Sequence, residues 1–285
     1  MRLKVRCRKK REQPIWILII ILIIFTIALC ISSYLLYKRH LDNRKIIEIS
    51  ESIEKDLNIE VKDIPIEDTI LVNPPDNQIS NEESDYWYYV NKPFTEVKFS
   101  SLLEKNKDTV GYIHVENTNI NYPIVYASDN DYYLTHDFNK KKNSAGWIYL
   151  DYRNNFDTLS DNTIIYGHGR NNTTMFGSLK NTLTSSWQSN KDNYVITIST
   201  PKENMLFQIF SIYTIEAESY YITTKFSSSG EKNEWIKTMK ERNISPVNVS
   251  VNEKDKILTL STCKNNYGER IVVHAKLIKK VANKS

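Results

Sequence analysis

Hydrophobic and polar positions along this chain form three successive patterns. An unbroken apolar run near the N-terminus is followed by a polar stretch, and from about Tyr86 onward short alternating runs are separated by polar turns. β-branched and aromatic residues that recur with a period of two are typical of half-buried strands. The pattern predicts eight strands, over Val110–Val115, Ile120–Tyr126, Gly146–Leu150, Thr163–Gly167, Tyr194–Ser199, Leu206–Ile215, Ile257–Thr262 and Ile271–Ile278. Many short strands of this kind indicate an all-β barrel or sandwich.

Two helices are expected among these strands. One is a short helix over Ser100–Lys105. In the other, Glu231–Arg242, the residues Trp235, Ile236 and Met239 form one apolar stripe, and the serines that precede the helix can cap its first turn. We interpret the stripe as a surface that packs against the strands, so both helices are expected to be peripheral.

The apolar run from Ile15 to Tyr37 contains 23 residues without a charged side chain. A helix of that length spans about 30 Å, which is the thickness of the hydrocarbon core of a bilayer. Trp16 near one end and Tyr34 near the other suit the two membrane interfaces. A cleaved signal peptide is the alternative, but its apolar region has about 7–15 residues and ends at a small-residue cleavage site, which this run lacks. The run therefore predicts a transmembrane anchor over residues 14–37.

Positive charge is concentrated in front of that anchor. The first 12 residues hold seven Lys and Arg side chains and one Glu, so they carry +6, whereas the net charge of the whole chain is +4 and the remainder carries −2. Basic residues before a membrane span hold the N-terminus in the cytoplasm. Residues 1–13 are thus predicted to be a cytoplasmic tail, and the chain beyond the single span to be extracellular. Because the excess positive charge lies on a tail, the basic composition does not support nucleic-acid binding.

A connecting segment over residues 38–85 is expected between the anchor and the strands. Apolar residues within Arg44–Leu57 recur with helical spacing, whereas residues 58–85 are polar and contain prolines and an acidic patch. Such a segment has little material for a core. We predict a helical stalk and linker over 38–85, followed by one domain over 86–285.

Only one of the three cysteines, Cys263, lies in the predicted extracellular part. Cys7 belongs to the tail and Cys30 to the membrane run, so no disulfide can form within the extracellular part. An unpaired thiol in an oxidising compartment is a liability unless it is buried or used.

Cys263 ends the first predicted strand of the stretch Ile257–Leu277, which consists of a strand, a polar turn and a second strand. Arg270 opens the second strand seven residues later. A thiol and a guanidinium can therefore lie side by side at one rim of a sheet. The alternative is a small buried cysteine next to a surface arginine.

His168 follows another predicted strand, within the run Tyr166–Gly169, where the flanking glycines permit a turn that leaves the imidazole at a rim. His114 and His274 lie inside strand patterns, where a hydrogen-bonded structural histidine is expected, and His136 lies in a polar loop, where we expect a solvated side chain. No pair of these residues has the spacing of a metal site, so we expect neither a metal nor a cofactor.

Several of these segments resemble the motifs of a known family. Thr259–Cys263 followed by Arg270 is similar to the TLxTC…R signature of sortases. Further segments resemble class B sortases in particular: Ile165–His168, Met175–Leu179, Val110–Ile113, Asn121–Ile124 and Tyr149–Asn154. The resemblance covers about residues 86–280 and includes the helix before the cysteine strand.

This resemblance implies an eight-stranded sortase-type β-barrel with peripheral helices, preceded by the N-terminal transmembrane helix. It also implies a cysteine transpeptidase that cleaves a C-terminal sorting signal of NPxTN-like sequence and transfers the protein to an amine of peptidoglycan. Its expected partners are thus surface proteins bearing that signal, a cell-wall amine and the membrane, with no nucleic acid.

The resemblance also assigns roles by position. Cys263 would be the nucleophile, His168 the acid and base, and Arg270 the oxyanion stabiliser. Five residues match positions that line the substrate groove of the family: Asn130, Leu134, Tyr221, Ile222 and Ser261. The chain departs from the family at Asn265, where class B enzymes often carry an acidic residue.

Two other functions are compatible with the residues alone. A membrane-tethered β-domain that binds wall peptides without catalysis would have an unreactive Cys263 far from His168. A cysteine peptidase would use the same groups but transfer the acyl group to water instead of an amine.

Overall fold

The computed structural model describes residues 15–57, 59–74, 81–263 and 268–283, with the backbone alone at 81–84 and 263. The tail predicted over residues 1–13 and the departure from the family pattern at Asn265 lie outside the described residues. Two compact units divide at Arg44 and Lys45, and all strands belong to the second unit.

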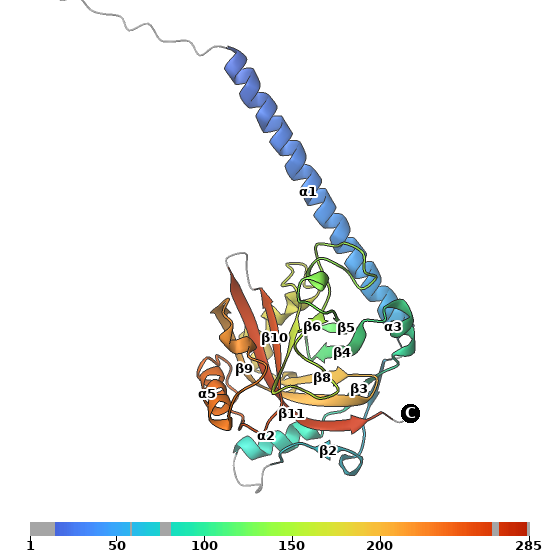
Figure 1. The fold of residues 1–285 in the computed structure, drawn as a ribbon, viewed down its shortest axis with the longest axis vertical. Coiled ribbons are helices and arrows are strands. Elements are labelled where there is room, and N and C mark those ends of the chain that lie inside the picture. Colours follow the sequence, from blue (N-terminus) through green and yellow to red (C-terminus); the bar gives the residue numbers. More distant parts are fainter. Residues whose placement is uncertain (1–14, 58, 75–80, 264–267, 284–285) are drawn as a thin grey trace, which may run out of the picture. The chain divides into compact units, whose positions relative to one another are not determined.

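Eight strands of the second unit close into a barrel (Figure 1). Their order around the barrel is β10, β7, β6, β5, β4, β8, β9 and β11, and pairing between β10 and β11 closes the ring. The bounds are β4 Thr109–Val115, β5 Asn121–Tyr126, β6 Tyr149–Leu150, β7 Asn162–Tyr166, β8 Val195–Ser199, β9 Glu203–Glu216, β10 Ile257–Cys263 and β11 Glu269–Ala282. The eight-stranded barrel predicted from the sequence is thus confirmed, and each predicted strand overlaps one strand of the ring.

The predicted strand over Gly146–Leu150 is shorter than expected, because only Tyr149 and Leu150 pair with neighbours in the sheet. Gly146 has a positive φ of 59°, and Trp147 donates its backbone N–H to the carbonyl of Tyr133 at 2.9 Å. A Cβ on Gly146 would come within 2.4 Å of that same carbonyl oxygen. The chain therefore packs against the Tyr133 loop before it enters the sheet.

Both predicted helices are present. α3 spans Ser100–Lys105, and α5 spans Ser229–Glu241 with Ser228 as its N-cap residue. Trp235, Ile236 and Met239 are buried in a core cluster with residues of β9, β10 and β11, so the apolar stripe is a packing surface as expected. Further elements lacked a clear sequence signal: α2 Asn81–Val90, α4 Ser185–Gln188, η2 Tyr132–Leu134, η3 Phe176–Leu183, η4 Lys191–Asn193 and η5 Tyr220–Ile222.

Part of the segment expected to be a linker packs onto the barrel. β1 (Ile59–Lys62) pairs with β3 (Phe94–Val97), and β2 (Ile70–Leu71) extends the large sheet by pairing with β11. The compact unit accordingly begins at Lys45, well before the domain start expected near Tyr86. The physical reason is that backbone pairing with an existing strand edge orders a polar segment that has little core material of its own.

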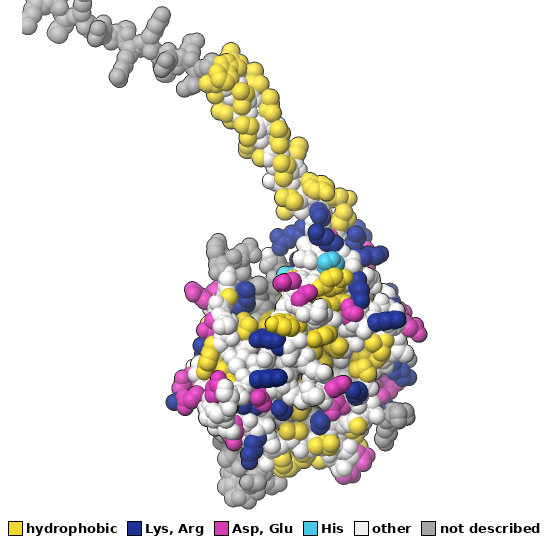
Figure 2. Space-filling model, viewed as in Figure 1, with side chains coloured by type: hydrophobic (Ala, Val, Ile, Leu, Met, Phe, Trp, Pro, Cys, Tyr) yellow, Lys and Arg dark blue, Asp and Glu magenta, His cyan; other side chains and the backbone are white. Residues whose placement is uncertain are grey.

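α1 spans Ile15–Asp56 as one helix, of which the first unit contains residues 15–44. Among the described residues it is the helix long and apolar enough to cross a membrane, judged by length and composition. Figure 2 shows apolar side chains along the visible face of its N-terminal part. Within the second unit, Ile46, Ile53 and Leu57 are buried, in agreement with the helical spacing of apolar residues in this segment.

Candidate functional site

The register of three neighbouring strands brings the predicted catalytic positions to one end of the barrel. Cys263 at the end of β10 pairs with Arg270 at the start of β11. On the other side of β10, Ser261 pairs with Tyr166 of the parallel strand β7, and the amide of Gly167 bonds to the Ser261 carbonyl at 3.4 Å. His168 follows Tyr166 by two residues, just beyond the end of β7, and Cys263 follows Ser261 by two residues at the end of β10. The Cys263 side chain lies outside the described residues.

Gly167 allows close packing before His168. A Cβ at this position would come within 2.4 Å of Ile148 Cδ1 and 2.8 Å of Phe176 Cγ, so any larger residue would push the strand end outward. Gly167 has no positive φ, whereas the sequence had suggested that this glycine served a sharp turn. Its contribution to the site is the space it leaves for two buried side chains.

The half-buried imidazole of His168 is held by a backbone carbonyl. Its Nε2 lies 2.8 Å from the carbonyl oxygen of Leu134. Because a carbonyl can only accept, Nε2 carries the hydrogen, and in the neutral ring the lone pair is on Nδ1. Burial lowers the pKa of His168 more than the bond to Leu134 raises it, and the positive charge of Arg170 lowers it further.

His168 and Arg270 line the same cavity, which has a volume of about 500 Å³. Arg270 is half-buried, and its Nη1 donates to the carbonyl of Gly268 at 3.3 Å. The other described lining residues are Leu134, Tyr149, Tyr166, Gly167, Ala217, Glu218, Ser219, Tyr221, Ile222, Ser261 and Thr262. The cavity thus combines an imidazole, a guanidinium and a mostly apolar wall beside the end of β10.

Four of the five predicted groove residues line this cavity: Leu134, Tyr221, Ile222 and Ser261. Tyr221 and Ser261 are joined by a hydrogen bond of 3.0 Å between their hydroxyls. Asn130 is not among the lining residues; its amide nitrogen donates to Asp151 at 3.2 Å and its amide oxygen accepts from the Tyr152 backbone at 3.0 Å.

A second cavity of about 520 Å³ opens between Tyr126, Phe156 and Lys202. None of the predicted catalytic or groove residues is among its described lining residues. Its walls include an arginine and a lysine, but the lysine is already paired with Asp157 at 2.6 Å. We therefore take the cavity beside His168 as the candidate active site.

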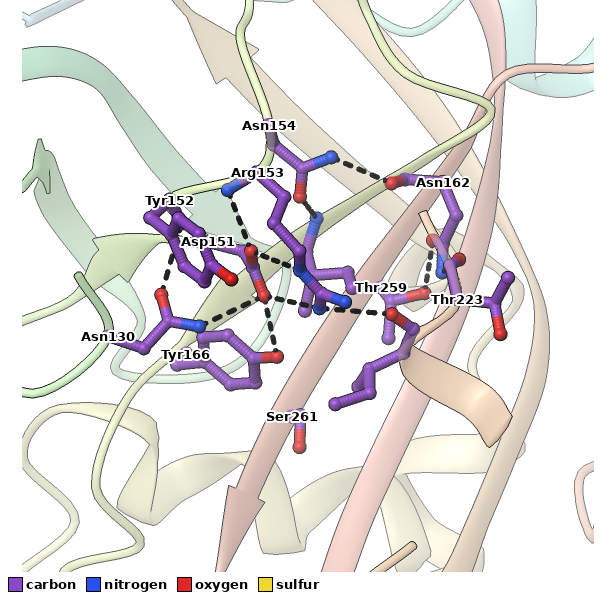
Figure 3. Close-up of polar contacts among 12 residues, drawn as sticks. Asn130, Asp151, Tyr152, Arg153, Asn154, Asn162, Tyr166, Thr223, Thr259 and Ser261 are labelled. Atoms are coloured by element: carbon purple, nitrogen blue, oxygen red, sulfur yellow. Dashed lines mark hydrogen bonds and ion pairs between the residues drawn. The ribbon is translucent and has the colours of Figure 1, made fainter. Parts of the chain in front are cut away.

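A polar cluster behind the candidate site was not assigned a role from the sequence, although its residues belong to the Tyr149–Asn154 motif (Figure 3). Asp151 is fully buried and accepts hydrogen bonds from Arg153, Tyr166 and Asn130. An Asp-x-Arg spacing immediately after a strand is the signal that could have indicated a buried ion pair.

The remaining histidines of the barrel follow the expectations in part. His274 is fully buried between Thr259 and Tyr213, as expected of a structural histidine. His114 is half-exposed and lies 3.3 Å from Glu116. The expectation of a solvated His136 is wrong, because its ring is half-buried and stacks on a neighbouring tyrosine with 4.1 Å between the centroids.

Known proteins resemble this chain in sequence and in fold. The sortase domain family matches residues 113–278 of the chain. Sortase B of Listeria monocytogenes is 36% identical over 191 aligned positions, and the match covers 63% of this chain and 73% of that protein. Sortase B of Staphylococcus aureus is 36% identical over 185 residues, which are 64% of this chain and 75% of that protein. The solved Staphylococcus aureus sortase B–substrate complex is 35% identical with a TM-score of 0.59, over 64% of this chain and 84% of that chain.

The family match spans more than half of the chain, and the eight-stranded barrel is that of the solved structures, so the chain belongs to the sortase family. Within that family its relatives are sortases B. The protein is thus an enzyme, a class B sortase-type cysteine transpeptidase, in agreement with the resemblance found in the sequence.

Proposed function

We propose that this sortase cleaves an NPxTN-like C-terminal sorting signal through a thioacyl-enzyme and transfers the cleaved protein to an amine of peptidoglycan. The observation that carries the proposal is the shared cavity of His168 and Arg270 beside the strand end at which Cys263 pairs with Arg270. The three groups then supply what acyl transfer needs: a nucleophile, a proton carrier and a fixed positive charge.

In the first half-reaction the Cys263 thiol gives its proton to His168, and the resulting thiolate attacks the scissile carbonyl carbon and forms a carbon–sulfur bond. The electron pair of the carbonyl moves to oxygen, and the guanidinium of Arg270 stabilises the oxyanion. An arginine suits this role because its planar fork can donate two hydrogen bonds and stays charged at any relevant pH. Collapse of the tetrahedral species breaks the carbon–nitrogen bond, and the leaving amine takes a proton from His168.

In the second half-reaction the incoming amine attacks the thioester carbon. Neutral His168 accepts the proton of that amine, and collapse of the second oxyanion releases the thiolate and leaves a new amide bond. Since Nε2 of His168 donates to Leu134, Nδ1 is the nitrogen at which we propose these proton transfers. The Leu134 carbonyl thereby fixes the tautomer and the ring orientation together.

The groove proposed for the sorting signal uses the five residues matched from the family: Asn130, Leu134, Tyr221, Ile222 and Ser261. Four of them line the cavity, and their mixture of apolar surface and hydroxyls suits a short peptide. Asn130 would contribute through its contact with the polar cluster instead. Selection of an NPxTN-like signal rests on the class B relationship.

For the whole chain we propose a cytoplasmic tail over residues 1–13, a single-pass anchor over 14–37, a connecting segment over 38–85 that contributes β1 and β2 to the second compact unit, and an extracellular catalytic barrel over 86–285. The length and composition of α1 support a membrane anchor, and the basic residues before it support this orientation. An extracellular barrel faces both the surface proteins and the cell wall.

The decisive experiment incubates the full-length chain in detergent micelles with a panel of sorting-signal peptides and an amine, and identifies products by mass spectrometry. We expect cleavage with formation of the peptide–amine conjugate, and none by Cys263→Ala. Cys30→Ala is the matched control, because it removes a thiol from the apolar run and should leave transfer unchanged.

Three outcomes would contradict the proposal. Turnover by Cys263→Ala would remove that residue from the mechanism. Hydrolysed peptide without conjugate at saturating amine would indicate a peptidase. Peptide binding by the unsubstituted chain without any cleavage, together with an unreactive Cys263, would indicate a binding domain.

A further inference from the structure

A single buried carboxylate connects several parts of the candidate site. Asp151 follows β6 directly and has no exposed surface. Its Oδ2 accepts from the Tyr166 hydroxyl at 2.9 Å and from the Asn130 amide at 3.2 Å (Figure 3). Tyr166 lines the cavity, and Asn130 is one of the proposed groove residues. Asp151 therefore bonds at once to two different segments that surround the site.

Arg153 forms an ion pair with this carboxylate through two hydrogen bonds. Its Nε donates to Asp151 Oδ1 at 2.8 Å and its Nη2 donates to Oδ2 at 2.7 Å. Two parallel hydrogen bonds between guanidinium and carboxylate fix direction as well as distance. Burial would raise the pKa of Asp151, but the donors from Arg153 and Tyr166 bring it below its ordinary value, so the carboxylate is charged.

The same guanidinium also contacts a residue that lines the cavity. Arg153 Nη2 also donates to the backbone carbonyl of Ile222 at 3.1 Å. Ile222 ends the single turn η5, and it lines the cavity with Tyr221. The ion pair thus ties the η5 wall to the strand end at Asp151, although the two are far apart in sequence.

A second tie holds the other side of the same turn. The Asn162 amide donates to the carbonyl of Thr223 at 3.0 Å and to that of Tyr221 at 3.3 Å. Its amide oxygen accepts from the Thr259 hydroxyl at 2.6 Å. Because Asn162 and Thr259 lie in β7 and β10, the barrel wall anchors the turn on that side, whereas the Ile222 carbonyl depends on Arg153.

We propose that the Asp151–Arg153 pair is a positioning pair that holds the Ile222 wall of the cavity in the conformation that accepts the peptide. This inference rests on the proposed function for its kinetic consequence, but the clamp on Ile222 can be measured without turnover. The pair does not touch the reacting atoms. It acts through the Ile222 carbonyl, the Tyr166 hydroxyl and the Asn130 amide.

The test uses Arg153→Lys in the full-length chain in detergent micelles. Lysine keeps the charge beside the buried Asp151, so folding is retained, but a single ammonium cannot reproduce the fork and the Ile222 bond together. We expect kcat/KM for the peptide to fall roughly 10- to 100-fold, because a misplaced binding group can cost up to about 10²-fold. Most of this fall should come from an increase in KM. A loss of folded protein would instead lower the apparent kcat at unchanged KM.

Two further measurements separate positioning from chemistry and from stability. The rate at which iodoacetamide alkylates Cys263 should equal that of the unsubstituted chain, because the thiol and His168 are untouched. Amide hydrogen exchange within residues 219–224 should become roughly tenfold faster, since local opening reports the lost contact. Lys202→Gln is the matched control, because it removes an exposed ion pair with Asp157 that lies outside the candidate site.

The outcomes distinguish this inference from the proposed function. Unchanged exchange in residues 219–224, or an unchanged KM in an active enzyme, would overturn the positioning role. If the unsubstituted chain turns over no peptide, the proposed function fails, and the exchange rate alone then decides whether Arg153 holds Ile222. Equal effects of Arg153→Lys and Lys202→Gln would also overturn the inference.

Discussion

Two regions beside strand β10 each contain a histidine, and the two imidazole rings differ in burial and in hydrogen bonding. His168 follows β7 and lies half-buried at the candidate site, where Nε2 donates to Leu134. His274 of β11 is fully buried beneath α5, between Thr259 and Tyr213. Only the first lines the 500 Å³ cavity.

The hydrogen bonds of His274 also require the opposite tautomer. The Thr259 hydroxyl donates to Asn162 at 2.6 Å, so it can only accept from His274, whose Nδ1 therefore carries the hydrogen. Nε2 is then the acceptor for the Tyr213 hydroxyl at 2.9 Å. Both ring nitrogens of His274 are thus used by the protein, whereas among the described residues only Nε2 of His168 has a partner. A histidine whose second ring nitrogen makes no hydrogen bond within the described part of the protein can exchange protons with a substrate.

The largest expected effect is the loss of this proton exchange in His168→Gln. Glutamine can still donate to the Leu134 carbonyl, so the fold should be kept while the acid and base function is lost. We expect kcat to fall about 10³-fold, within the usual range for removal of a general acid–base. Steady-state transfer assays measure the loss of turnover, and thermal unfolding measures whether the fold is kept. His114→Gln is the control for both measurements. Retention of more than a tenth of the turnover would show that His168 is not the proton carrier.

Arg270→Lys is expected to have the next largest effect. The ammonium keeps the charge but cannot donate two fixed hydrogen bonds to the developing oxyanion. Loss of an oxyanion donor costs about 10²–10³-fold in kcat, and KM should change little because the contact forms mainly in the transition state. Arg170→Lys, close to the same histidine, is the matched control. A change confined to KM would argue instead that Arg270 binds the peptide.

The strands of the barrel could be predicted from the sequence because alternation of apolar and polar residues is a local property of each strand. The pattern left a barrel and a sandwich open, and the resemblance to sortases implied the barrel. β1 and β2 could not, since they lie in a polar segment and are ordered by pairing with β3 and β11. Their conformation depends on partners that no local pattern encodes.

The candidate site was predictable to a similar degree. Cys263, Arg270 and His168 belong to motifs. The pairing of β10 with β11 sets Cys263 opposite Arg270, and the pairing of β10 with β7 brings the end of β7 that precedes His168 beside the end of β10. The contact between Arg153 and Ile222 was not predictable, because its acceptor is a backbone carbonyl in a loop. Every residue has such a carbonyl, so the sequence carries no mark of the one that is used.

Acid is expected to lower the free energy of unfolding because His274 is fully buried. Burial lowers the pKa of His274 from 6.5 to about 3, so below pH 6.5 the unfolded chain takes up a proton that the folded chain refuses. The contribution of neutral His274 to the free energy of unfolding is fully present above pH 6.5 and is lost as the pH falls toward 3. At pH 5 the cost relative to pH 8 is about 2 kcal/mol.

Urea unfolding of the unsubstituted chain and of His274→Gln between pH 8 and pH 5 measures this contribution as the difference between their slopes. The pKa values of Asp151, which is buried, and of Asp161, which is partly exposed, are lowered, so their contributions to stability are lost only below this pH window. His168 has a lowered pKa as well, but it is present in both proteins and cancels. Parallel slopes would mean that His274 is not held neutral by burial.

The smallest expected effect concerns the helix that covers His274. Ser228 Oγ accepts a hydrogen bond from the Glu231 amide at 3.2 Å and so caps α5. Trp235 of this helix packs edge-on against the His274 ring, with 5.3 Å between the ring centroids. Ser228→Ala should lower the free energy of unfolding by about 1 kcal/mol, the usual cost of losing an N-cap. Ser227→Ala is the matched control, because residue 227 contributes its backbone N–H, which donates to the Glu231 carboxylate at 2.6 Å. Since α5 covers the structural histidine and no residue of α5 lines the cavity among those described, kcat should stay unchanged. A fall in kcat beyond the loss of folded protein would show that the two regions are coupled through β10.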